Sequence, residues 1–250
     1  MMAFVVFLLI IGCYAIGQLR RNYLLKKYDD QIVRDNSTMT GALLALLGLM
    51  LAFSFSMANS RYDSRRQVMV EEANAIGTAI LRTQMYPDSV RALFHQSMKE
   101  YVEVRIATLT ARKDPDILLV NQNTSDSLGR RIWNIVSDYA SVDPSLVKTS
   151  ELIPALNDMI DIVTTRRAAF EATIPDSILY FLLFLCLSSA FLLAHDRKSN
   201  TDWMVVIGFS IMLSATLFTI IDLDRPHSGL ISMERPQQKI EALRNMFASD

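Results

Sequence analysis

The side chains whose types and spacing most clearly suggest a function lie in one uncharged segment, residues 40–59. An apolar side chain recurs there every four residues, at Ala45, Leu49, Phe53 and Met57. On a helix this spacing places the four on one face. Around a symmetry axis they would form stacked apolar rings, which hold water poorly and oppose ion passage. In a monomer the same row would face the core or the lipid, so spacing alone leaves both interpretations open.

Three arginines follow this row, at Arg61, Arg65 and Arg66. Rings of arginine at the mouth of a pathway favour anions. Arginine also anchors helices to phosphate headgroups at a membrane surface. We therefore predict that these residues, with Met57, lie at a pore mouth or at the interface, and we weigh the two equally.

Small residues recur beside the apolar row at intervals of three or four. Side chains of this size allow helix backbones to approach closely in lipid. The stripe predicts helix packing, either within the chain or between subunits. Its members are Gly41, Gly48, Ala52 and Ser56.

Signatures of catalysis are absent from the sequence. It contains no GxSxG, P-loop, HExxH or GxGxxG motif, and its three histidines are far apart. Glu71 and Glu72 would point about 100° apart on a helix, so we expect a solvated face there and not a cation site. The interpretation is that the protein is not an enzyme and requires no cofactor.

Composition places these residues in a membrane protein. Hydrophobic residues make up 51% and charged residues 20% of 250 residues, and the mean hydropathy is +0.22. Segments free of charge are long enough to cross a bilayer as helices. We expect transmembrane helices at about 2–19, 40–59, 177–194 and 203–221. A net charge of −1 argues against a nucleic-acid partner.

The expected fold is an all-α membrane protein with four transmembrane helices and a helical extramembrane domain between helices 2 and 3. Its parts are residues 1–59 with helices 1 and 2, the helical domain 60–174, residues 175–221 with helices 3 and 4, and a polar tail 222–250 with a short helix at about 236–248. Helix 2 is expected to continue to about residue 84, because residues 60–84 hold apolar side chains at helical spacing and no proline.

Three further expectations concern the interior of the helical domain. Residues 114–116 should break a helix that begins after Pro87, and 121–125 should form a polar loop. Pro154 should lie in the first turn of the last helix of this domain, where proline is tolerated.

The distribution of basic residues does not orient the chain. Seven Lys and Arg residues flank the spans on each side, so the positive-inside rule gives a tie.

Two sequence landmarks carry a family resemblance. Residues 51–66, with Arg61-Tyr62-Asp63-Ser64-Arg65-Arg66 at their end, are followed by 71–79; the second landmark is 222–231, just after the last span. Together with the four-span layout they resemble the bestrophin-like family of bacterial membrane proteins, over essentially the whole chain. True bestrophins are more distantly similar, since the arginine motif keeps its outer arginines and only one aromatic residue.

The resemblance implies a pentameric, mostly anion-selective ion channel in the bacterial inner membrane, with its helical domain in the cytoplasm. The implied partners are the lipid bilayer, further copies of the chain and small inorganic ions. Counting back from Arg61, the three neck positions of the family fall on Phe53, Leu49 and Ala45, the row found from spacing. The competing interpretation is a non-conducting membrane scaffold or signalling protein that uses the helical domain for docking or sensing.

A metal site after the fourth span is the weakest of the implied features. Animal bestrophins bind calcium with acidic residues there, and Asp222 and Asp224 occupy a similar place. Two acids are too few for such a site, so we prefer to interpret them as polar caps at a helix end.

Overall fold

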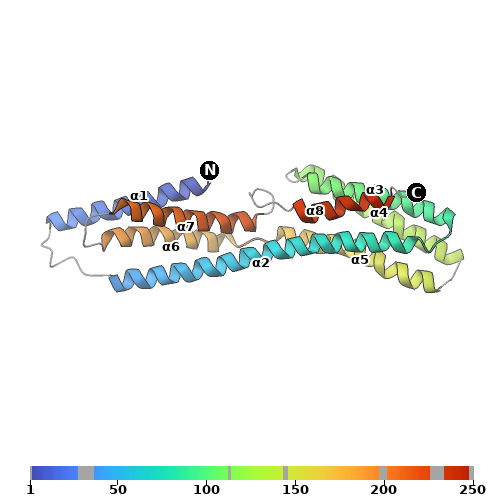
Figure 1. Ribbon diagram of the computed structural model, residues 1–250, viewed down its shortest axis with the longest axis horizontal. Helices are drawn as coiled ribbons and strands as arrows, with labels where there is room; N and C mark the ends of the chain where they lie inside the picture. The colour runs from blue at the N-terminus through green and yellow to red at the C-terminus, as the bar shows by residue number, and fades with distance from the viewer. Residues whose placement is uncertain are drawn as a thin grey trace. The chain divides into compact units, whose positions relative to one another are not determined.

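The computed structural model describes residues 2–27, 37–111, 114–142, 146–196, 202–225 and 234–247. These ranges contain helices and turns and no strand, which confirms the all-α prediction (Figure 1). The elements are α1 (Met2–Lys27), α2 (Ser37–Thr83), α3 (Asp88–Thr110), α4 (Pro115–Val142), α5 (Leu146–Glu171), α6 (Asp176–His195), α7 (Trp203–Asp224), α8 (Glu234–Glu241) and the 3-10 helix η2 (Ala242–Phe247).

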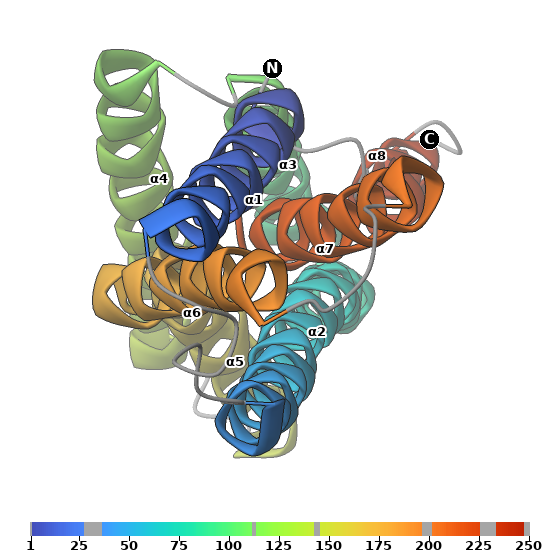
Figure 2. The same cartoon turned by 90° about the vertical axis from the view of Figure 1, so that its left-hand side faces the viewer.

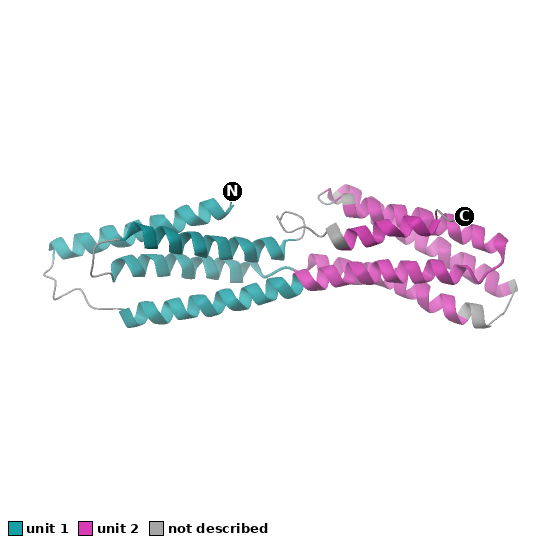
Figure 3. Ribbon diagram, in the orientation of Figure 1, with its two compact units in different colours: residues 1–61, 173–225 teal, residues 62–172, 226–250 magenta. Residues whose placement is uncertain are grey.

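The chain divides into two compact units (Figure 3). Unit 1 comprises residues 1–61 and 173–225, and unit 2 comprises residues 62–172 and 226–250. Within the described residues, four helical segments are long and apolar enough to cross a membrane, and they contain α1, α2, α6 and α7. The number and order of spans predicted from the sequence are therefore confirmed.

In unit 1, α1 lies alongside α6 and α7, and α2 lies on the opposite side of these two helices (Figure 2). Gly17 lies at a close approach between α1 and α6. A Cβ atom added at Gly17 would lie 2.4 Å from the carbonyl oxygen of Phe191 and 3.0 Å from Cβ of Ala194. Only a residue without a side chain allows the two backbones to come this close.

Unit 2 is a helical bundle around a continuous apolar core. Apolar residues of α2, α3, α4 and α5 recur at helical spacing and are buried together, among them Ile76, Phe94, Ile132 and Leu156. The end of the chain joins this core, because Ile240, Leu243 and Phe247 are buried in it. Part of the segment expected to be a polar tail is thus packed structure.

The C-terminal segment is also held by an ion pair on the surface of unit 2. Nε and one terminal nitrogen of Arg244 donate to the two carboxylate oxygens of Glu103 on α3, at 2.7 and 2.6 Å. The neighbouring guanidinium lowers the pKa of the Glu103 carboxyl below its ordinary value of 4.5.

Several predicted boundaries need correction. α1 continues past residue 19 to Lys27, because residues 20–27 contain no glycine or proline to end it. Residues 121–125 are not a loop but lie inside α4; their weak helix propensity is overridden by the buried face that Leu128 and Ile132 continue. α5 begins at Leu146, so Pro154 lies inside the helix and not in its first turn. The predicted break at 114–116 agrees with the gap between α3 and α4.

Helix α2 has the continuity expected of it. It runs unbroken for 47 residues, about 70 Å at 1.5 Å per residue. Its first part belongs to unit 1 and its second part to unit 2. The residues singled out by the sequence lie mostly on this helix.

Candidate ion pathway on the second helix

Helix α2 has a buried face and an exposed face in unit 1. Leu47, Ser54 and Ala58 are almost completely buried, and they recur at intervals of seven and four, as one side of a helix does. The hydroxyl of Thr40, on the same side, donates a hydrogen bond to the carboxylate of Asp196. These contacts determine which residues of α2 point away from the other helices of unit 1.

The predicted neck row lies on the exposed face. Leu49 is 51% exposed and Phe53 57% exposed, Ala45 is also exposed, and Met57 is half-buried. Aromatic and aliphatic side chains this open on a membrane helix contact either lipid or another subunit. The structure thus removes one alternative left by the sequence, that the row is the core of a monomer.

The stripe of small residues shares the exposed face. Gly41, Gly48, Ala52 and Ser56 are all exposed. A Cβ atom added at Gly41 or Gly48 would meet no atom of the described residues within 4 Å. The described part of the chain therefore provides no helix against which the stripe could pack, in contrast to Gly17 on α1.

The three arginines differ in their exposure to solvent. Arg65 is 0% exposed and donates from a terminal nitrogen to the carbonyl oxygen of Ala172, at 3.3 Å. The prediction that Arg65 lies at a pore mouth or a lipid interface is therefore wrong. Arg65 is seven residues after Ala58, so it continues the buried side of α2. Arg61 is half-buried and Arg66 is exposed.

Glu71 and Glu72 also separate, and the expected solvated face holds only for the first. Glu71 is exposed and accepts a hydrogen bond from the Gln67 amide, at 2.9 Å. Glu72 is 0% exposed because it lies between two arginines. The expectation for Glu72 is wrong because spacing along one helix does not show the arginines that α3 and α5 bring to it.

Glu72 forms a buried ion cluster with Arg105 of α3 and Arg166 of α5. One Glu72 oxygen accepts from Nε of Arg105 at 2.6 Å and lies 2.5 Å from a terminal nitrogen of that residue. The other accepts from Arg166 at 2.7 Å. Burial lowers the pKa of the Arg166 guanidinium, an effect that the charge of Glu72 opposes. The cluster ties α2, α3 and α5 together inside unit 2.

The two aspartates after the last span lie in different surroundings. Asp224 is buried, and its two oxygens accept from the backbone N–H of Ile174 at 2.9 and 3.0 Å. Asp222 is half-buried. Throughout the described ranges, no three His, Cys, Asp or Glu side chains are grouped so that they could hold a metal ion. Asp224 thus binds the backbone just before α6, and not the end of its own helix.

Comparison with known proteins gives the family. The sequence pattern of the Bestrophin-like domain matches residues 7–236. No curated protein matches the chain.

The solved structures that resemble the chain include crystal structures of a bacterial Bestrophin homolog from Klebsiella pneumoniae. One has a TM-score of 0.74 and 13% identity, covering 99% of each chain. A variant of the same homolog has a TM-score of 0.75 and 13% identity over 100% of both chains. At this identity the likeness shows the fold alone. Because the domain pattern covers most of the sequence, the chain belongs to the Bestrophin-like family.

Proposed function

We propose that the protein assembles into a homo-oligomeric ion channel in which α2 lines an axial pore. The observation that carries the proposal is the exposed apolar row Ala45, Leu49 and Phe53 on a membrane helix. In the assembly these side chains form a narrow neck, where ions lose part of their hydration and passage is restricted. Permeation is passive, since the sequence shows no nucleotide-binding motif to drive it.

The exposed small residues support the assembly step. Without a hydrophobic driving force in lipid, helices associate through close packing of small residues. Gly41 and Gly48 leave open space beside α2, which a helix of a second copy fills. By family membership we propose a pentamer.

Charge selectivity is the part of the proposal that the structure weakens. The predicted anion preference depended on three arginines, and Arg65 is buried. Arg66 is exposed, Arg61 is half-buried, and the exposed carboxylate of Asp63 lies on the same stretch of α2. Rings of opposite charge offset one another, so we propose a weak preference for anions that depends on Arg66.

The proposed location is the bacterial inner membrane, with the part of unit 2 between α2 and α6 in the cytoplasm. Family membership supports this orientation, and the tie in flanking basic residues does not oppose it.

Planar-bilayer recording of the purified protein tests the channel. Phe53→Ala removes most of each side chain from the neck, so conductance should rise or become constitutive while the oligomer is preserved. Phe55→Ala is the matched control, because Phe55 lies about 200° around the helix from Phe53. It should leave the open probability unchanged.

Two results would contradict the proposal. If the wild-type protein and both variants are silent, the non-conducting scaffold is the better interpretation. If Phe55→Ala opens the pore and Phe53→Ala does not, α2 is rotated in the assembly and the neck residues are wrongly assigned.

A further inference from the structure

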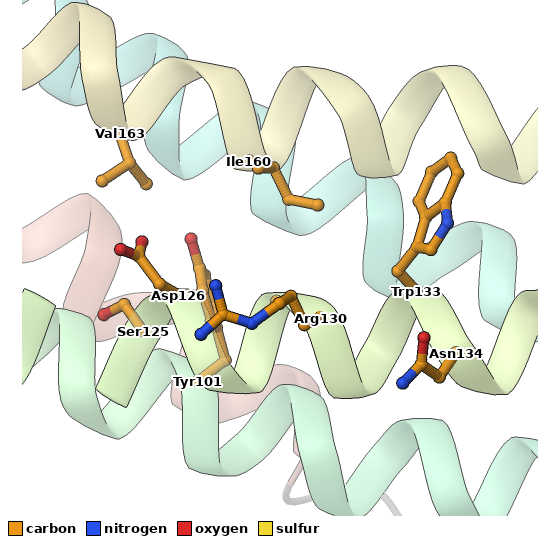
Figure 4. A pocket seen from close by; sticks show the side chains of 9 residues that line it. Tyr101, Ser125, Asp126, Arg130, Trp133, Asn134, Ile160 and Val163 are labelled. Carbon is orange, nitrogen blue, oxygen red and sulfur yellow. The ribbon is translucent and has the colours of Figure 1, made fainter. Parts of the chain in front are cut away.

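Unit 2, which does not contain the predicted neck residues, has a cavity of about 490 Å³ between α4 and α5 (Figure 4). The two helices give it walls of different character. Ile160 and Val163 project into it from α5, whereas α4 contributes Asp126, Arg130 and Trp133. Its volume lies within the range typical of small-molecule sites, and so does the combination of apolar surface with a few polar groups.

Ser125 provides the first sign that the cavity is incomplete without a ligand. Its side chain lines the cavity and is only 2% exposed. Its hydroxyl has no hydrogen-bond partner in the described part of the chain. The oxygen is almost inaccessible to water, and buried hydroxyls are normally satisfied, so this group lacks a partner at the wall of the cavity.

The charges on α4 provide the second sign. Asp126 and Arg130 are one helical turn apart, the spacing at which opposite charges usually pair. Within the described ranges, neither forms an ion pair or a hydrogen bond. Both side chains line the cavity and are exposed to solvent, so a carboxylate and a guanidinium are accessible together to a molecule that enters.

Tyr101 adds a neutral polar group at the same place. Its hydroxyl donates to the carbonyl oxygen of Met159 at 3.5 Å, and its ring lines the same cavity as Asp126. Burial raises the pKa of Tyr101 to about 12. The phenol therefore keeps its proton at neutral pH, and the cavity contains one positive and one negative side chain.

We propose that this cavity binds a small zwitterion with an apolar group, the chemistry of an aromatic or branched-chain amino acid. The ligand carboxylate pairs with Arg130, whose planar fork suits two parallel hydrogen bonds. The ligand ammonium pairs with Asp126, close to the hydroxyl of Ser125. The apolar group packs on Ile160, Val163 and the indole of Trp133, a ring that favours aromatic partners.

The test is a titration of the full-length, detergent-purified protein with L-phenylalanine. Trp133 and Trp203 are the two tryptophans of the chain, so a Trp203→Phe background leaves Trp133 as the fluorescent reporter inside the cavity. We expect a saturable change in Trp133 emission. Two analogues, 2-phenylethylamine without the carboxylate and 3-phenylpropanoate without the ammonium, should each bind at least tenfold more weakly.

Charge-removing variants make the test specific. Arg130→Gln should weaken phenylalanine binding at least tenfold and leave 2-phenylethylamine unaffected. Asp126→Asn should do the same for phenylalanine and leave 3-phenylpropanoate unaffected. Arg131→Gln is the matched control, since Arg131 pairs with Glu100 at 3.2 Å and does not line the cavity.

Three outcomes would overturn the proposal. They are the absence of a saturable signal with phenylalanine, equal binding of phenylalanine and both analogues, and equal loss of binding in Arg131→Gln and Arg130→Gln. None of these depends on whether the protein conducts ions.

Discussion

Replacement of Glu72 by glutamine should strongly destabilise unit 2. Glu72 is the single carboxylate between Arg105 and Arg166, and the side chains of both arginines are less than one tenth exposed. The glutamine side chain has the same size but no charge, so two buried guanidinium groups lose their counter-ion. Breaking a buried ion pair from one side costs about 3–5 kcal/mol.

The effect should be visible as a lower unfolding temperature. For a protein of this length, 1 kcal/mol corresponds to a shift in Tm of about 2–4 °C. We therefore expect Glu72→Gln to lower the Tm by about 10 °C. The assay is thermal unfolding of the detergent-purified protein, followed by its helical circular dichroism at a fixed heating rate.

The neighbouring residue supplies a matched control. Glu71→Gln makes the same chemical change one position away, at an exposed side chain that contacts Gln67. It should leave the Tm nearly unchanged. A second variant tests the mechanism: adding Arg166→Met to Glu72→Gln removes one uncompensated charge and should recover part of the lost stability. If the two single glutamine variants unfold at the same temperature, the buried ion cluster does not have the role argued for it.

Three other predictions concern assembly, pH and orientation. Gly48→Leu should reduce the yield of oligomer, measured by mass in detergent. Gly208→Leu on α7 is the control, because an added Cβ also meets open space there, and it should leave the yield unchanged. Equal yields would contradict assembly through α2. Arg244 lowers the pKa of Glu103. Their ion pair therefore stabilises the docked C-terminal segment fully at pH values above 4.5, the ordinary pKa of the carboxyl. This stabilisation is lost as the pH falls through the lowered pKa. Faster proteolysis of that segment in acid should show this loss, and Arg244→Ala should abolish the pH dependence. Asn123 is exposed on α4, so a cysteine introduced there can report orientation. In a variant without the two native cysteines, Asn123→Cys should not react with an impermeant thiol reagent in intact cells. Labelling there would place this part of the chain outside the cell.

The sequence predicted the membrane half of the fold well because long uncharged segments have few alternatives to a spanning helix. It also predicted the length of α2, since no proline interrupts the apolar spacing. It failed where the outcome depends on a distant partner. Glu72 and Arg65 read as surface charges until Arg105, Arg166 and Ala172 are brought beside them.

The spacing along α2 contains a signal for the burial of Arg65. Leu47, Ser54, Ala58, Arg65 and Glu72 are separated by seven, four, seven and seven residues, which is the spacing of a single side of a helix. Extending the buried side of the membrane segment along α2 would have placed both charges inward. The packing of Ile240, Leu243 and Phe247 into unit 2 had a weaker signal, an apolar row within a short and otherwise polar segment.

The buried side of α2 determines what its exposed side can do. In unit 1 the helix is held by Leu47, Ser54 and Ala58, and in unit 2 by the carboxylate of Glu72 between two arginines. A shift of the helix by one residue is a rotation of about 100°. In unit 1 it would expose Leu47 and Ala58, and in unit 2 it would move the carboxylate of Glu72 away from its two arginines. Because both changes are costly, the rotation of α2 is fixed within each unit. The exposure of Leu49 and Phe53 is therefore a consequence of the side chains that α2 buries on its opposite face in unit 1.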